Sequence, residues 1–131
     1  MPKEAIIVPC TQEKVWDSEP NLGAVPAKDA YIKPGFQAWR SYAEKTGLPW
    51  FILSTKYGLI QPDQLIERYN VPVSAALANS SLLALLKRQG DEFNLRQFDR
   101  LVLLDWERFE PLVRAAAPDP GVKCVLRKLQ Y

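Results

Sequence analysis

The sequence predicts an α/β protein, a small three-layer sandwich with a mainly parallel sheet of about four strands. Three observations lead to this prediction. Short buried-type apolar runs alternate with amphipathic helical segments, Gly or Pro residues end most segments, and 131 residues fit one domain, 1–131. Strands that alternate with helices form right-handed crossovers, which place parallel strands in one sheet with helices on both faces.

In the first half of the chain, residues 4–8 form a β-branched run that predicts a strand ending at Pro9. A long loop with several prolines follows, and loops of this length in small domains usually carry function. Apolar residues at three-and-four spacing predict a helix over 35–46 that Gly47 stops. The continuous apolar run 49–54 is typical of a strand that is covered on both faces.

The second half continues the alternation. One helical turn is expected after Gln61, within 62–69. The leucine-rich segment 74–89 predicts the longest helix, with a cap at Asn79, Ser80 or Ser81 inside it and its end at Gly90. Three further segments complete the pattern: a strand at 100–105, a helix at 107–117 and a strand at 122–126.

Composition excludes several classes of chemistry. The chain has no histidine, which removes the usual general base, Ser-His and Cys-His pairs and most zinc sites, so neither a metal nor a cofactor is expected. A net charge of +2 does not predict a broad positively charged surface that would bind nucleic acid. Cys10 and Cys124 are expected as reduced thiols, and no stretch approaches the ~20 apolar residues of a membrane span. We therefore expect a cytoplasmic protein that does not bind membranes.

Ligands of such sheets bind beyond the carboxyl ends of the strands, where Cys10 and Thr11 follow the first strand. Lys14 lies four residues after Cys10, and a nearby cation would favour the reactive thiolate of Cys10. The alternative for Cys10 is a small buried hydrophobic residue at a strand end.

The second strand is followed by Ser54, Lys56, Tyr57 and Gly58. A positive φ at Gly58 would let this turn present the Ser54 and Lys56 side chains and nearby N–H groups as an anion or nucleobase cradle. The alternative is a polar turn with Tyr57 packed at its rim.

Three more residues are candidates for ligand contact. Asp105, after the third strand, either caps the following helix or contacts a ligand. Tyr31 in the long loop and Tyr69 further on could supply stacking faces for a base.

Together these motifs resemble two protein families. The order Pro9-Cys10-x-x-x-Lys14, then Tyr31, then Ser54-Thr55-Lys56-Tyr57-Gly58 with Tyr69 is similar to the YaaA-like peroxide-stress proteins, which implies DNA binding and a role in stress response. The Pro-Cys-x-x-x-Lys segment is also similar to the core motif of archaeosine synthase. That second resemblance implies a nucleobase-sized pocket built on Cys10, Lys14, Ser54 and Lys56.

Three functions remain open at this point. The first is an enzyme acting on a nucleobase, nucleotide or nucleic acid, with Cys10, Lys14 and Ser54 in catalytic roles and Thr11, Tyr31, Lys56, Tyr57, Gly58, Tyr69 and Asp105 binding the ligand. The second is a non-catalytic DNA-binding module that uses Lys28, Lys33, Arg40 and Lys45. The third is a structural or partner-binding domain, which a strand edge plugged by Trp16, Trp50 or Trp106 would favour.

Overall fold

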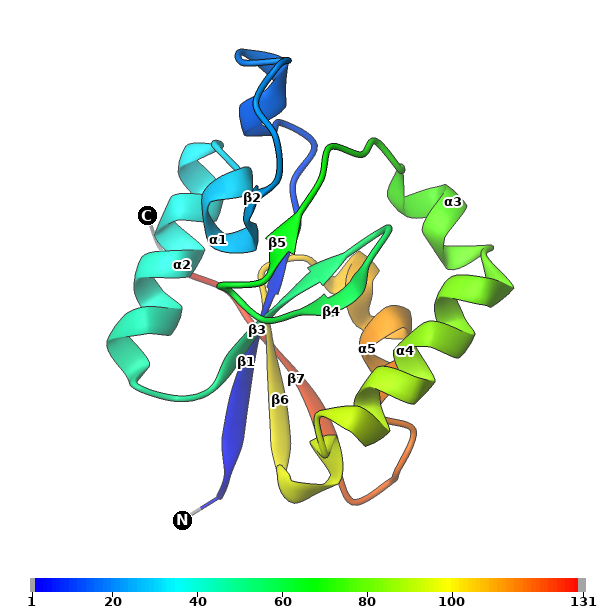
Figure 1. Cartoon of the computed structure of the whole chain (residues 1–131). Coiled ribbons are helices and arrows are strands. Elements are labelled where there is room, and N and C mark those ends of the chain that lie inside the picture. The colour runs from blue at the N-terminus through cyan, green and yellow to red at the C-terminus, as the bar shows by residue number, and fades with distance from the viewer. Residues whose placement is uncertain (1, 130–131) are drawn as a thin grey trace.

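The computed structural model describes residues 2–129 and contains a five-stranded sheet with helices on both sides (Figure 1). Its strands are β1 (Glu4–Pro9), β3 (Trp50–Ser54), β4 (Gly58–Ile60), β6 (Arg100–Leu104) and β7 (Lys123–Arg127). Their order is β4-β3-β1-β6-β7, and only β4 pairs in the antiparallel sense. The predicted α/β class with a mainly parallel sheet is confirmed, and β4 is an addition to the four predicted strands.

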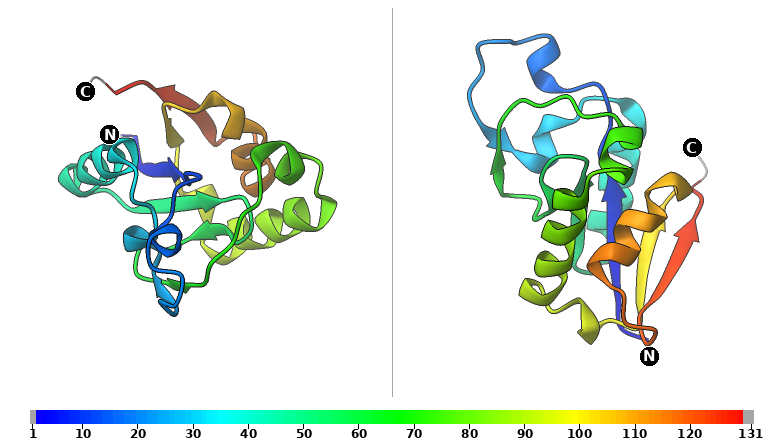
Figure 2. Two further views of the ribbon diagram at one scale, coloured as in Figure 1. Left: turned by 90° about the horizontal axis from the view of Figure 1, so that it is seen from above. Right: turned by 90° about the vertical axis from the view of Figure 1, so that its right-hand side faces the viewer.

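Helices cover the two faces of the sheet. α2 (Pro34–Thr46) packs against β1 on one side, while α4 (Ser80–Glu92) and α5 (Glu110–Ala116) pack against each other on the other side (Figure 2). The smaller elements are η1 (Val15–Asp17), α1 (Ala27–Ala30), α3 (Val73–Leu77), η2 (Leu95–Gln97), η3 (Glu107–Phe109) and the antiparallel pair β2 (Val25–Pro26) and β5 (Leu65–Ile66). Among the residues described, no helix is both long enough and apolar enough to cross a membrane.

Some helix boundaries differ from the prediction for identifiable reasons. The segment 74–89 forms two helices, α3 and α4, because the Asn79 side chain caps α4 by accepting hydrogen bonds from two backbone N–H groups. α4 then continues through Gly90, where the missing side chain allows close packing: a Cβ there would lie 1.8 Å from the Ala116 carbonyl oxygen. The helical turn expected after Gln61 is replaced by a turn and β5.

The order of the strands positions the candidate site. The connection after β1 leads to β3 on one side of β1, whereas β6 lies on the other side and leads on to β7. The loops after β1 and β6 therefore diverge at the carboxyl edge and leave a crevice, the usual ligand position in open α/β sheets. The segments between β1 and α2 and between β5 and α3 rise beyond this edge (Figure 1).

Candidate functional site

A pocket of about 270 Å³ opens at this carboxyl edge, and we call it the edge pocket. Four segments line it: the residues after β1, the residue after β3, the segment leading into α3, and the loop after β6 with η3. Of the predicted site residues, the edge pocket brings together Cys10, Thr11 and Lys14. The other seven predicted residues do not line it.

Cys10 is fixed at the end of β1, where its backbone N–H donates to the Leu53 carbonyl at 3.0 Å. Its side chain is 5% exposed but lines the edge pocket. Burial raises the pKa of the Cys10 thiol, and hydrogen bonds to Thr55 and Tyr69 and the charge of Lys14 offset only part of this effect. The net direction is therefore opposite to the expected thiolate, and the resting group at neutral pH is a thiol.

The Lys14 ammonium is buried at the edge pocket, with the residue 4% exposed. Nζ donates to the Gln12 carbonyl at 3.2 Å and lies 4.4 Å from the centre of the Tyr69 ring. Burial lowers the pKa of Lys14, and the nearby Cys10 and Asp17 offset part of this shift. Asp17 uses one carboxylate oxygen for the backbone N–H of Lys14 at 2.9 Å. Within residues 2–129, no carboxylate forms an ion pair with the Lys14 ammonium.

Tyr31, Tyr69 and Ser54 form a buried hydroxyl network outside the wall of the edge pocket. The two phenol oxygens are 2.6 Å apart and share a hydrogen bond, and the Ser54 hydroxyl lies beside them and lowers the pKa of both. Ser54 Oγ also accepts the backbone N–H groups two and three residues further on, at 3.1 and 3.0 Å. Burial raises the pKa of both phenols. Because both rings are buried, they offer no open face to a base, and Tyr69 supports Cys10 through a hydrogen bond instead.

Lys56 and Tyr57 lie in the hairpin turn between β3 and β4, and Gly58 is the first residue of β4. Gly58 has φ +71°, as the motif required, but the Gln89 side chain of α4 covers this turn. Gln89 donates to the Tyr57 carbonyl at 2.9 Å and accepts the Leu59 N–H at 2.8 Å. The exposed Lys56 ammonium lies over the Tyr57 ring. This arrangement is closer to the second alternative, a polar turn, than to an open ligand cradle.

Asp105 joins three parts of the fold. It has φ +57°, a left-handed conformation that Asp tolerates better than most residues. Its carboxylate accepts the Trp39 indole N–H and the Leu129 backbone N–H, and its own N–H donates to the Arg127 carbonyl. The N-cap of η3 is Trp106, so Asp105 does not cap the helix as expected. Its carboxylate oxygens hold Leu129, in the segment after β7, against α2, and Asp105 does not line the edge pocket.

The predicted site did not include most of the edge-pocket lining, and three of the omitted residues bear on ligand binding: Thr55, Trp106 and Arg108. Thr55 follows Ser54, and the alternation of side chains at a strand end was a usable signal for choosing it. Trp106 had been considered beside Asp105 as part of a cap or a ligand contact and also as a plug, and it is 38% exposed beside an open pocket. No local sequence pattern pointed to Arg108, because it reaches the edge pocket through the position of η3 in the fold.

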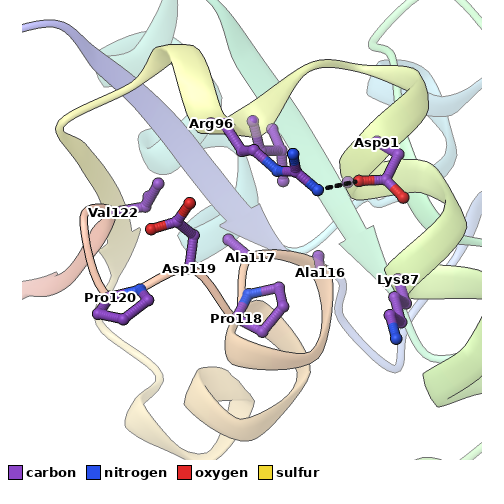
Figure 3. Close-up of a pocket in the computed structure, with 11 residues that line it drawn as sticks. Lys87, Asp91, Arg96, Ala116, Ala117, Pro118, Asp119, Pro120 and Val122 are labelled. Carbon is purple, nitrogen blue, oxygen red and sulfur yellow. Dashed lines mark hydrogen bonds and ion pairs between the residues drawn. The ribbon is translucent and has the colours of Figure 1, made fainter.

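Another pocket, of about 310 Å³, lies between α4, η2 and the segment that joins α5 to β7 (Figure 3). Asp91 and Arg96 form an ion pair at 3.3 Å on the α4 and η2 side, and Asp119 accepts the Gly121 N–H at 2.8 Å. Both acidic groups are therefore engaged within the protein. No group of three or more His, Cys, Asp or Glu side chains that could hold a metal ion occurs in the described part of the chain. The edge pocket, with its buried cation and thiol, is the stronger candidate site.

Residues 6–84 match a protein family model described as "Family of unknown function (DUF6884)". The chain belongs to this family. A relative, the uncharacterized protein YfjM of Bacillus subtilis (strain 168), is 33% identical over 114 residues, which cover 86% of this chain and 76% of that protein. No solved structure matches the chain significantly. The matched range includes the β1 and β3 ends of the edge pocket.

Membership in DUF6884 corrects the resemblance inferred from the motifs. The YaaA-like and archaeosine synthase assignments were wrong, because the matching family and the relative are different proteins. The basic residues named for DNA binding also have acidic neighbours: Lys28 pairs with Asp63 at 2.7 Å, and Arg40 pairs with Asp29 at 2.9 Å and Glu44 at 3.3 Å. The comparisons and the charges therefore give no support for DNA binding or a stress role.

Proposed function

We propose that this DUF6884 protein is an enzyme that acts on a nucleotide, whose phosphate binds at Lys14 in the edge pocket. The buried Lys14 ammonium is the observation that carries this proposal. A buried charge without an ionic partner is costly, and an anion in the pocket would stabilise it with charge-assisted hydrogen bonds. The exposed Arg108 lines the same pocket and supplies further donors, and Thr11, whose hydroxyl donates to the Glu13 carbonyl at 3.4 Å, and Thr55 complete its polar side.

A nucleotide also fits the apolar side of the pocket. Trp106 presents an exposed aromatic surface there, and aromatic side chains are the usual stacking partners of bases. Trp106 thus takes the stacking role that the sequence had assigned to Tyr31 and Tyr69. The expectation of a cytoplasmic protein fits such a ligand and stays a prediction.

The catalytic part of the proposal rests on Cys10 and Lys14. The two groups line the same pocket, and the charge of Lys14 offsets part of the rise that burial causes in the pKa of the Cys10 thiol. The Lys14 ammonium, held charged by the bound phosphate, lowers the pKa of the neighbouring Cys10 thiol, so that loss of the thiol proton to water leaves a thiolate as the nucleophile in a chain that has no histidine. Tyr69, which contacts both groups, holds them in place.

Binding is tested by calorimetry with AMP, GMP, CMP and UMP. We expect Lys14→Met to weaken binding of the preferred nucleotide at least tenfold and Arg108→Ala to weaken it several-fold. Lys45→Ala, which removes an exposed positive charge from α2, is the matched control and should bind as the wild type does. Circular dichroism spectra establish that each variant is folded. Absence of nucleotide binding by the wild type, or equal losses in Lys14→Met and Lys45→Ala, would refute the proposal.

Catalysis is tested separately by incubating the protein with the bound nucleotide and following its mass. The wild type should convert the nucleotide, and Cys10→Ala should bind it without converting it. Cys124→Ala removes the other thiol, which lies in β7, and should leave turnover unchanged. Equal turnover by wild type and Cys10→Ala would remove Cys10 from the mechanism.

A further inference from the structure

We infer that the ligand site has a second, apolar subsite, which takes the base of the nucleotide whose phosphate binds in the edge pocket. This inference rests on the proposed function and adds the part of the ligand that determines specificity. The subsite is a cavity of about 510 Å³ at the start of α2. Pro34, Phe36, Ala38 and Trp39 supply most of its wall, and we call it the α2 cavity.

The α2 cavity continues the edge pocket. Thr11 and Trp106 line both spaces, so Trp106 stands between them. The Trp106 ring lies edge to face with Trp39 of the α2 cavity at 5.9 Å and with Phe109 of the edge pocket at 5.8 Å. A ligand that crosses from one space to the other must pass this aromatic ring.

The two spaces differ in chemistry as the two ends of a nucleotide do. The edge pocket carries the buried Lys14 ammonium and Arg108, whereas Lys33 is the only charged residue that lines the α2 cavity among the described residues. The edge pocket, at about 270 Å³, is below the roughly 300–1,000 Å³ typical of small-molecule sites, so a larger ligand extends beyond it. The adjoining cavity, with aromatic walls, is where an uncharged planar ring is accommodated.

Gly35 gives a selective test, because it lines the α2 cavity and a Cβ built there meets no heavy atom within 4 Å. Gly35→Leu fills the cavity without a clash at the Cβ. Gly23 is the matched control, since a Cβ there also meets nothing within 4 Å and the residue lines neither space. The affinities of the four nucleoside monophosphates and of ribose 5-phosphate are measured for both variants.

We expect Gly35→Leu to weaken the preferred nucleoside monophosphate at least tenfold and ribose 5-phosphate less than twofold, with Gly23→Leu unchanged. Trp106→Ala should show the same selectivity for the base and serves as a second variant. If Gly35→Leu changes neither ligand while Lys14→Met weakens both, the subsite is refuted and the phosphate site stands. If the wild type binds neither ligand, the proposed function and the subsite fail together.

Discussion

Gly58→Ala distinguishes a structural glycine from a ligand cradle. Gly58 has φ +71° in the β3–β4 turn, and a Cβ there would lie 2.2 Å from Gln89 Oε1. The added methyl group must displace the Gln89 side chain, which holds the turn through hydrogen bonds to the Tyr57 carbonyl and the Leu59 N–H. The substitution therefore adds the cost of the left-handed backbone to the loss of two hydrogen bonds.

The magnitude follows from these two parts. A left-handed conformation costs a residue with a side chain roughly 1–2 kcal/mol, and each lost hydrogen bond costs about 1 kcal/mol. Gly58→Ala should lower the free energy of unfolding by about 3–4 kcal/mol. Gly47, at the end of α2, is the control: its φ is +69°, but a Cβ there meets nothing within 4 Å. Gly47→Ala should cost only about 1–2 kcal/mol.

Urea denaturation followed by circular dichroism measures both values. In a Gln89→Ala background, the cost of Gly58→Ala should fall to that of Gly47→Ala, because the hydrogen bonds are already absent. Equal costs of Gly58→Ala and Gly47→Ala in the wild-type background would refute this reasoning. Nucleotide affinity should not change in Gly58→Ala. A specific loss of binding by a folded variant would instead support a ligand cradle at the β3–β4 turn.

Three further predictions concern the Cys10 thiol and the packing of α4. In Cys124→Ala protein, alkylation of Cys10 should have its pH midpoint above 9.0, because burial raises the pKa of the thiol. The contribution of the buried thiol to the free energy of unfolding is complete below pH 9 and should decline as pH rises through the raised pKa. A midpoint below that of the urea-unfolded chain would contradict this prediction. Tyr69→Phe should move that midpoint higher and destabilise the fold by about 1–3 kcal/mol in urea, because it removes hydrogen bonds to the thiol and the hydroxyl network; an unchanged midpoint would exclude the thiol contact. Gly90→Ala should destabilise by about 3 kcal/mol, because its methyl group would meet the Ala116 carbonyl; the stabilisation usual for Gly→Ala in a helix would show that α4 and α5 are less closely packed.

The fold class was predictable because its signals are local. Strands covered on both faces appear as continuous apolar runs, and Gly47 ends α2 with a φ of +69°, as a helix-stopping glycine does. β4 was not predictable in the same way, because three residues, Gly58–Ile60, carry no measurable periodicity. Its turn is held by Gln89 from α4, a contact that no local pattern reveals.

The candidate site was predictable only where strand ends determine it. Cys10 follows β1, so the carboxyl edge was its expected position, and Lys14 lies beside the same pocket. Arg108 and the segment before α3 reach the pocket through tertiary packing alone. Ser54 was chosen over Thr55 by residue type, although successive side chains of a strand point to opposite sides.

The polar residues that do not line the pocket still explain how its reactive groups are held. Ser54 Oγ fixes the turn after β3 through two backbone N–H groups, and this turn brings Thr55 against the Cys10 thiol. Tyr69 hydrogen bonds to the same thiol, while its ring lies 4.4 Å from the Lys14 ammonium. A thiol and an ammonium group placed by buried, hydrogen-bonded neighbours need little reorganisation when a ligand binds, which is the condition for catalysis by preorganised groups. Of the residues that sequence reasoning assigned to the site, Ser54 and Tyr69 therefore lie one layer behind the pocket wall, next to the groups that contact Cys10 and Lys14.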